Sequence, residues 1–357
     1  MDKPGAFINA IGSAVPTHDI HGAFIDWAAE RIDDPRARAA FRRMAERSGI
    51  DHRWSVLPPT PEGGSPVAPG GFYAGAMPPT SERMALYAHE APKLALSAIE
   101  KLAGRTPLDG ITHLVVASCT GFVAPGIDQI IAAELGLDPR VERTLVGFMG
   151  CYAAVAALRL AYHIARSEPE ARVLVVTIEL SSLHLQFDER IEQLLAMLQF
   201  GDGAAAALVT AEARGFGMSR LFAITLPETT DLIRWTIGDE GFAMHLSGQV
   251  PARIAHSLGD ETVRQLVFNG GGPAGMDAWA VHAGGRSILD AVETGLHLGP
   301  DALKESRGVL ARFGNMSSST LMFVLADLLD DPARTNGIAI AFGPGLAAEG
   351  FQFRRAP

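Results

Sequence analysis

The stretch that decides the fold reads Val146-Gly147-Phe148-Met149-Gly150-Cys151-Tyr152-Ala153-Ala154-Val155-Ala156-Ala157-Leu158. A strand-like segment passes through a glycine-bounded turn into an Ala/Leu-rich helix, and Cys151 lies at the start of that helix. Backbone N–H groups there have no partners within the helix, and the helix dipole favours negative charge. We therefore expect the Cys151 thiol to ionise easily and to act as a nucleophile. The alternative is that Cys151 is a small buried core residue.

The length and composition of the chain are those of a globular enzyme with a large core. It has 357 residues, of which 48% are hydrophobic and 20% charged, so we expect two domains or one body built of two halves. A net charge of -10 argues against nucleic-acid binding. Two cysteines make no disulfide framework, which favours a reducing compartment. Without a signal peptide at its start or an apolar run of membrane-spanning length, the chain is expected to be cytoplasmic.

Strands and helices alternate along the chain, and the pattern restarts near residue 214. Apolar strands are predicted at 6–12, 111–118, 171–179, 277–282 and 337–345, with helices between them. We expect 221–226 and 232–237 to pair as strands and 250–267 to form one helix. The long Pro/Gly-rich stretch 57–80 is expected to be a surface excursion. This plan predicts an α/β body with two similar halves, 1–212 and 213–357, and ligands at strand ends.

Two more residues share the kind of setting that Cys151 has. His282 and Asn315 each lie where a buried element gives way to a Gly or Ser turn, and functional residues favour such supported edges. An imidazole can take the proton of a thiol, and His and Asn donors can hold an oxyanion. The alternatives are that His282 is a hydrogen-bonded core histidine and that Asn315 is a helix N-cap. Spacing alone does not show that the three residues converge.

An arginine-rich helix is a local exception in this acidic chain. Between residues 35 and 53 it carries Arg36, Arg38, Arg42, Arg43, Arg47 and Arg53. Such a run is either a solvated helix face or a docking patch for an anionic ligand such as a phosphorylated cofactor.

Five blocks, in order, resemble the signature sequences of type III polyketide synthases, the chalcone and stilbene synthase family. They are Gly150-Cys151, Phe200-Gly201-Asp202-Gly203-Ala204-Ala205, His282-Ala283-Gly284-Gly285, Gly314-Asn315-Met316-Ser317-Ser318 and Phe342-Gly343-Pro344-Gly345. The resemblance covers nearly the whole chain. It implies a thiolase fold, with duplicated αβαβα halves and covered mixed sheets, and a homodimer with one site in each subunit.

The resemblance also implies a mechanism. An acyl group moves from a starter acyl-CoA to Cys151, malonyl-CoA loses CO2, and His282 and Asn315 stabilise the resulting enolate and the oxyanions of condensation. Phe200 matches a wall phenylalanine that orients the malonyl group. The products would be pyrones, resorcinols or phenolics. No metal and no tightly bound cofactor is expected.

Other residues are assigned by the resemblance alone. Arg43 and Arg47 match two cations that bind CoA, while a third matches Ala40, and Gly284 and Gly285 would lie near the pantetheine arm. The expected substrate pocket comprises Cys119, Thr120, Ala124, Ser181, His184, Met244 and Phe342. Because Ala124 and Ser181 replace larger residues of the plant enzymes, we hypothesise room for a larger or aliphatic acyl chain. Cys119 resembles a second thiol of some bacterial members, or it is a plain wall residue.

Three alternatives stay open at this point. An initiating ketoacyl-ACP synthase shares the fold and the Cys/His/Asn set, although the Phe342–Gly345 turn and the Asn315 block favour the polyketide branch. A papain-like peptidase uses the same residue types, but the neighbourhood of its cysteine is missing here. A catalytically silent binding homologue is the third.

Overall fold

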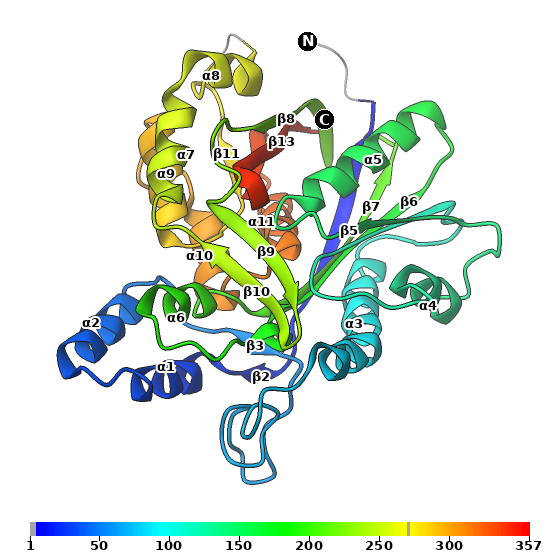
Figure 1. The fold of residues 1–357 in the computed structure, drawn as a ribbon. Coiled ribbons are helices and arrows are strands. Elements are labelled where there is room, and N and C mark those ends of the chain that lie inside the picture. The colour runs from blue at the N-terminus through cyan, green and yellow to red at the C-terminus, as the bar shows by residue number, and fades with distance from the viewer. Residues whose placement is uncertain (1–4, 270–271) are drawn as a thin grey trace.

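The computed structural model describes residues 5–269 and 272–357, and a nine-stranded mixed sheet runs through them (Figure 1). The strand order is β11-β12-β13-β8-β1-β7-β6-β4-β5. The bounds are β1 Phe7–Ala14, β4 His113–Ser118, β5 Glu142–Gly147, β6 Val173–Leu180, β7 Asp202–Thr210, β8 Phe216–Thr225, β11 Ala278–Val281, β12 Asn336–Gly343 and β13 Ala347–Arg355. Short strand pairs lie outside this sheet: β2 His18–Asp19 with β3 Trp54–Ser55, and β9 Ile233–Gly238 with β10 Gly241–Leu246.

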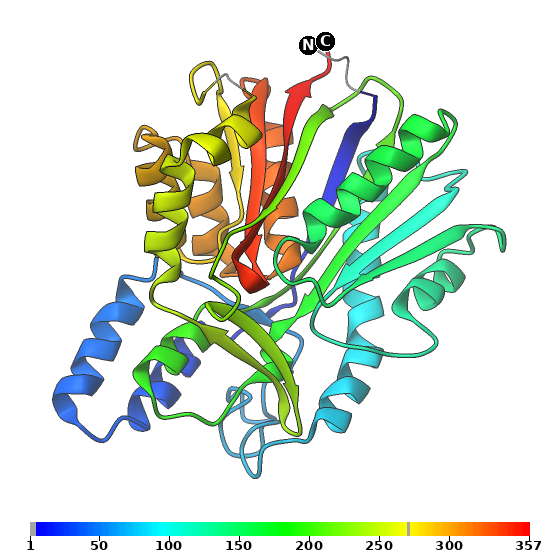
Figure 2. The same cartoon turned by 45° about the horizontal axis from the view of Figure 1, so that its top comes forward.

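Helices cover the sheet on its outer faces and fill the space between its two halves (Figure 2). They are α1 His21–Glu30, α2 Pro35–Glu46, α3 Thr80–Ala103, α4 Ile127–Glu134, α5 Ala153–Ser167, α6 Ile191–Met197, α7 Val250–Gly259, α8 Glu261–Phe268, α9 Arg286–Leu296, α10 Lys304–Phe313 and α11 Ser318–Asp330. Two short 3₁₀ turns, η1 Ser181–His184 and η2 Pro344–Leu346, follow β6 and β12.

The layers follow from the apolar clusters. One cluster joins α5, α11 and the inner strand faces of both halves, a second joins α3 and α4 to the first half, and a third joins α7 and α9 to the second half. Residues 318–326 of α11 are buried without a break, because a helix in the middle layer is enclosed on every side. All eight residues of β6 are buried, as in a doubly covered sheet. This layering confirms the predicted thiolase fold.

The two halves meet where β1 lies between β7 and β8. β1 pairs with β7 along most of its length, from Phe7 to Ala14, but with β8 only through Phe7↔Gly217 and Ile8↔Phe216. The predicted division after residue 212 falls in the link between β7 and β8. It stays a prediction.

Two sequence expectations about the second half are wrong. The segments 221–226 and 232–237 do not pair with each other: β8 pairs with β13 and β1, while β9 turns back at Gly241, whose φ of 90° suits a tight hairpin, and pairs with β10. The expected helix 250–267 is two helices. Asp260 ends α7 and its side chain accepts hydrogen bonds from the first N–H groups of α8, so a side-chain cap divides the segment.

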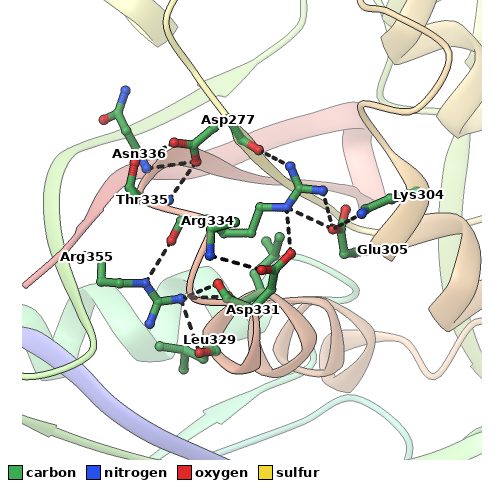
Figure 3. Close-up of polar contacts among 11 residues, drawn as sticks. Asp277, Lys304, Glu305, Leu329, Asp331, Arg334, Thr335, Asn336 and Arg355 are labelled. Carbon is green, nitrogen blue, oxygen red and sulfur yellow. Dashed lines mark hydrogen bonds and ion pairs between the residues drawn. The ribbon is translucent and has the colours of Figure 1, made fainter.

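A polar cluster ties the loop after α11 to the amino-terminal ends of β11 and β12, the ends opposite to His282 (Figure 3). Arg334 donates to Glu305 over 2.7 Å and to the backbone oxygen of Asp277 over 2.6 Å, and Arg355 donates to the backbone oxygen of Arg334 over 2.8 Å.

None of the helices within residues 5–269 and 272–357 is both long enough and hydrophobic enough to span a bilayer.

Candidate active site

Cys151 lies in a sharp turn between β5 and α5. Phe148 and Gly150 both have positive φ, 57° and 80°. A Cβ on Gly150 would meet Cδ of Pro344 at 2.2 Å, and one on Gly343 would lie 3.2 Å from the backbone nitrogen of Cys151. Only glycine permits this contact, so the Gly-Pro turn after β12 packs directly against the turn of the cysteine.

The Cys151 thiol is buried, and this changes its expected ionisation. Burial raises its pKa to about 12, while the hydrogen bond with the Ser317 side chain lowers it. The expectation that the helix start eases ionisation is therefore wrong for the thiol by itself. Cys151 precedes the N-cap residue Tyr152, outside the first helical turn, and the loss of hydration outweighs the helix dipole.

His282 follows the carboxyl end of β11, and its backbone N–H donates to Ile340 of β12 over 2.9 Å. Its side chain is buried, and neither ring nitrogen has a hydrogen-bond partner among the described residues. Burial lowers the pKa of this imidazole to about 3. The alternative of a hydrogen-bonded core histidine is wrong, since a buried ring with two free nitrogens is suited to a ligand or a reacting group.

Asn315 connects two loops of the site. Its backbone N–H donates to Gln199 over 2.7 Å, its backbone oxygen accepts from Gly201 over 3.0 Å, and its side-chain amide donates to the backbone oxygen of Gly284 over 3.2 Å. It does not cap α11, because Ser317 is the N-cap residue. The amide has a second N–H beyond the one given to Gly284, and that donor has no partner among the described residues, so it can serve a ligand.

Ser317 links the cysteine to the asparagine, a role that the sequence did not predict. Its side chain lies close enough to the Cys151 thiol to lower the thiol pKa, and its backbone N–H donates to Oδ1 of Asn315 over 2.8 Å. The loop that Asn315 holds, at Gly284, lies against the His282 ring: a Cβ on Gly284 would be 3.4 Å from Nε2. The structure thus brings Cys151, Asn315 and His282 into one connected site.

A second missed residue, Glu179, lies behind this site. Its carboxyl group is fully buried and accepts from the Cys119 N–H over 3.0 Å, from the Thr120 hydroxyl over 2.9 Å and from the Ser318 hydroxyl. Burial raises its pKa to about 7. A single acid within the apolar run of β6 was the available signal, because a buried carboxyl group needs partners.

Four predicted residues share one small cavity of about 70 Å³. They are the wall residues Ser181, His184, Phe200 and Met244. The other walls come from α1, from the excursion 57–80, and from Trp235 on β9. Cys119 and Thr120 do not line it, because both are held in the Glu179 network.

The remaining predicted pocket residues lie elsewhere. An aromatic cluster fills the space beside Cys119: His184 stacks on Phe242 at 4.2 Å, and the Trp235 indole donates to the backbone oxygen of Cys119 over 3.0 Å. Ala124 is exposed, and Phe342 packs in the apolar cluster of α7 and α9. Neither residue lines the cavity, and their predicted pocket roles stay predictions.

A larger cavity of about 510 Å³ opens between α2, α6 and α9. Arg47 lines it and Arg43 does not. Gly284 and Gly285 are not on its wall, but a Cβ on Gly285 would lie 2.1 Å from the amide oxygen of the lining residue Gln199. Arg286, which was not among the predicted site residues, also lines this cavity and donates to the backbone oxygen of Arg47 over 3.1 Å.

Sequence comparisons match both halves of the chain. Residues 2–213 fit the profile of the N-terminal domain of chalcone and stilbene synthases, and residues 220–357 fit that of the C-terminal domain. The chain is 32% identical to the alpha-pyrone synthesis polyketide synthase-like protein Pks18 of Mycobacterium tuberculosis, over 98% of this chain and 91% of that protein. It is 34% identical to type III polyketide synthase C of Arabidopsis thaliana, over 69% of this chain and 68% of that protein.

Solved structures of type III polyketide synthases also superpose on this chain. The crystal structure of PKS-I from the brown alga Ectocarpus siliculosus superposes with a TM-score of 0.89 at 28% identity, over 99% of both chains. The C-terminal type III polyketide synthase domain of Steely1 from Dictyostelium superposes with a TM-score of 0.89 at 26% identity, over 99% of this chain and all of that one.

Proposed function

The chain belongs to the chalcone and stilbene synthase family, and we propose that Cys151 carries the growing acyl group in its reaction. As a type III polyketide synthase it is an acyltransferase that condenses CoA thioesters with loss of CO2 from malonyl-CoA. The observation that carries the residue assignment is that the buried His282 imidazole has no hydrogen-bond partner among the described residues, while Asn315 bonds both Ser317, which neighbours the Cys151 thiol, and Gly284 of the His282 loop.

Loading begins with proton transfer from Cys151 to His282. Each group is neutral by itself, because burial raises the pKa of the thiol and lowers that of the imidazole. The charged pair forms only by direct transfer, after which the two opposite charges stabilise each other. The thiolate attacks the thioester carbonyl of acyl-CoA, the carbon–sulfur bond to CoA breaks, and the CoA thiolate takes the proton back from His282.

Extension of the acyl chain uses hydrogen bonds donated by Asn315 and His282. When the bond between the malonyl carboxylate and its α-carbon breaks, CO2 leaves and the electron pair forms an enolate at the thioester. The free N–H of the Asn315 amide and one N–H of neutral His282 hold the enolate oxygen. The α-carbon then attacks the acyl group on Cys151, and the product leaves as a β-ketoacyl-CoA while the Cys151 thiolate is regenerated. Phe200 lies beside Asn315 and limits the space for water.

The larger cavity receives CoA in this proposal. Arg47 and Arg286 are cations on its wall, and guanidinium groups suit phosphate. The pantetheine arm would pass Gly284 and Gly285 toward His282. Arg43 lies on α2, one turn before Arg47, and does not line the cavity, so it would attract the CoA phosphates from outside the cavity mouth.

The test is product analysis by mass spectrometry. A panel of acyl-CoA starters is incubated with malonyl-CoA, with Cys151→Ala beside the wild type. Condensed product from the wild type alone is expected, and condensed product from Cys151→Ala would refute the assignment. Replacing malonyl-CoA by malonyl-carrier protein tests the ketoacyl-ACP synthase alternative. The product masses and spectra distinguish pyrone, resorcinol and phenolic ring closure. Light scattering tests the proposed homodimer, and fractionation of the source cells tests the cytoplasmic location.

A further inference from the structure

Arg53 is a buried cation that has no part in the reaction steps proposed above. It lies immediately before β3, and only 2% of its surface is exposed. Its backbone is fixed beside the start of α1, because its N–H donates to Oδ1 of Asp19 over 3.2 Å and its oxygen accepts from the N–H of Ile20 over 2.8 Å. Its side chain begins on the same base, since Nε donates to Nδ1 of His21 over 3.0 Å.

The head of the Arg53 side chain closes the segment 197–201, which ends α6 and leads into β7. Nη1 donates to the backbone oxygen of Phe200 over 2.8 Å and to that of Met197 over 3.1 Å. One nitrogen thus joins the two ends of the turn that follows α6. A buried charged donor is tolerated only where its hydrogen bonds are made, and two of those that Arg53 makes are with this segment. The conformation of the segment therefore depends on the guanidinium.

The segment 197–201 in turn fixes the backbone of Asn315. The oxygen of Gln199 accepts from the N–H of Asn315 over 2.7 Å, and the N–H of Gly201 donates to the oxygen of Asn315 over 3.0 Å. This is the pairing of two parallel strands, so the oxygen of Phe200, between them, points to the opposite side and meets Arg53. Arg53 and Asn315 therefore bind opposite edges of the same short segment.

The stem of Arg53 also packs directly against the residue before Asn315. Gly314 has a φ of 68°, and a Cβ on it would lie 2.9 Å from Cγ of Arg53 and 2.8 Å from the backbone oxygen of Gln199. Glycine permits this close approach. Because the Asn315 amide also bonds the backbone oxygen of Gly284 beside His282, a shift of Arg53 would be passed on to the proposed reaction centre.

We propose that Arg53 is a positioning residue for the decarboxylation of malonyl-CoA. By fixing the segment 197–201, it places the amide of Asn315, which donates to the enolate oxygen, and the ring of Phe200 beside it. This inference rests on the proposed function, and in it Arg53 acts through Asn315 and contacts none of the reacting atoms. A donor stabilises the enolate only if it is already in place, and a misplacement of about 1 Å can cost about a hundredfold in rate.

Two variants separate the donors of Arg53 from its bulk. Arg53→Met keeps an unbranched stem and has no donor, whereas Arg53→Lys keeps the charge and a donor. The matched control is Arg83→Met. Arg83 is also buried, donates to the backbone oxygens of Leu183 over 3.0 Å and Leu185 over 2.8 Å, and like Arg53 has an Nη2 without a partner among the described residues. Its bonds do not involve the segment 197–201.

The experiment measures two half-reactions separately. Malonyl-CoA alone reports decarboxylation, through the acetyl-CoA and CO2 released when the enolate takes up a proton. Acyl-CoA alone reports loading, through the mass of acylated Cys151. Circular dichroism and urea unfolding establish that each variant is folded.

Arg53→Met should lower kcat for decarboxylation about hundredfold and change KM for malonyl-CoA less than about twofold, because it disturbs a donor used in the transition state. Loading should keep most of its rate, since proton transfer from Cys151 to His282 does not use Asn315. Arg53→Lys should regain about tenfold of the lost kcat, because an ammonium can still donate to a carbonyl oxygen but lacks the fork of the guanidinium. Arg83→Met should lose stability and keep kcat within about twofold of the wild type, as expected for independent sites.

A double-mutant cycle tests whether Arg53 acts through Asn315. Arg53→Met combined with Asn315→Ala should decarboxylate malonyl-CoA no more slowly than Asn315→Ala alone. Multiplied losses in the double variant, equal losses of loading and decarboxylation in Arg53→Met, or a wild-type kcat in that variant would each overturn the positioning role. If Arg53→Met does not fold, Arg53→Lys takes its place in the cycle under the same criteria. If Asn315→Ala alone decarboxylates at the wild-type rate, the proposed function has failed instead.

Discussion

The sulfur of Cys119 accepts a hydrogen bond from the backbone N–H of Gly150 over 2.9 Å. The donor immediately precedes the proposed nucleophile, so this second cysteine braces the turn that presents Cys151. Burial raises the pKa of the Cys119 thiol well above its ordinary value. These observations argue against a second reactive thiol at Cys119 and, because Cys119 does not line the 70 Å³ cavity, give it a bracing role instead of that of a pocket wall.

Removing the Cys119 sulfur should loosen this turn. We expect Cys119→Ala to lower kcat about tenfold with little change in KM, because the N–H of Gly150 loses its buried partner, a loss of about 1–3 kcal/mol. Cys119→Ser keeps an acceptor and should retain most of the activity. Steady-state kinetics on both variants provide the measurement. Equal damage by both would show that the thiol itself is required.

Ionisation of Cys151 should depend on His282. In His282→Gln the imidazole that takes the proton is absent, so alkylation of Cys151 by iodoacetamide should keep rising with pH toward the pKa of about 12 that burial gives the thiol. In the wild type the rate should level off at a lower pH. His256→Gln, at an exposed position on α7, is the control. Identical pH profiles for wild type and His282→Gln would contradict the proton-transfer step.

The arginines of the 510 Å³ cavity should act on the phosphates of CoA. Arg47→Glu and Arg286→Glu should each raise KM for malonyl-CoA about tenfold, a loss of about 1.4 kcal/mol, with kcat little changed. The effect should shrink at high salt. The N-acetylcysteamine thioester of malonate, which has no phosphate, should respond to neither change. The control is Arg140→Glu, on an exposed arginine paired with Asp138. An equal effect on the phosphate-free substrate would rule out phosphate binding.

His184 should make the protein less stable in acid. Its pKa is lowered to about 4 by burial, from 6.5. Between these values the unfolded chain binds a proton that the folded chain does not, so the free energy of unfolding falls as the pH drops from 6.5 toward 4, by up to about 1.4 kcal/mol per pH unit. In His184→Gln, urea unfolding should show a shallower fall over this range. Parallel curves for the two proteins would contradict the assignment.

The cluster in Figure 3 should support stability without affecting catalysis, because it lies at the strand ends remote from His282. Arg334→Ala should reduce the free energy of unfolding by about 1–3 kcal/mol, because the largely buried carboxylate of Glu305 loses the guanidinium that donates hydrogen bonds to it. Lys304→Ala is the matched control. Its ammonium is exposed and 3.7 Å from Glu305, so it should cost less than about 1 kcal/mol. A change in kcat in Arg334→Ala would show that the cluster reaches the site.

Sequence reasoning found the fold because it depends on local patterns, and it proposed the reacting groups from the same patterns. Continuous apolar runs predicted the covered strands, and the glycines around Cys151 and Pro344 predicted turns that the structure packs together. Which strands pair with each other was harder to predict from the sequence. The segment 232–237 has the same apolar character as 221–226, and only the tertiary arrangement decides that its partner is β10.

Burial and cavity shape escaped sequence reasoning for a different physical reason. The helix-start argument for Cys151 omits the cost of removing a thiolate from water, which depends on neighbours far along the chain. Likewise, a replacement by a smaller residue at Ala124 says nothing about which distant side chain fills the space. The role of Ser317 depended on a contact 166 residues away in the sequence, between its side chain and Cys151.

The position of β1 between β7 and β8 has a consequence for synthesis on the ribosome. Ile8 pairs with Val209 and Phe216, so the first strand leaves the ribosome about 200 residues before either neighbour exists. At about 5–20 residues per second, it waits for about 10–40 seconds. During that time its apolar side chains and strand edges have no native strand partner, so nascent β1 is exposed to mispairing until β7 and β8 have been made.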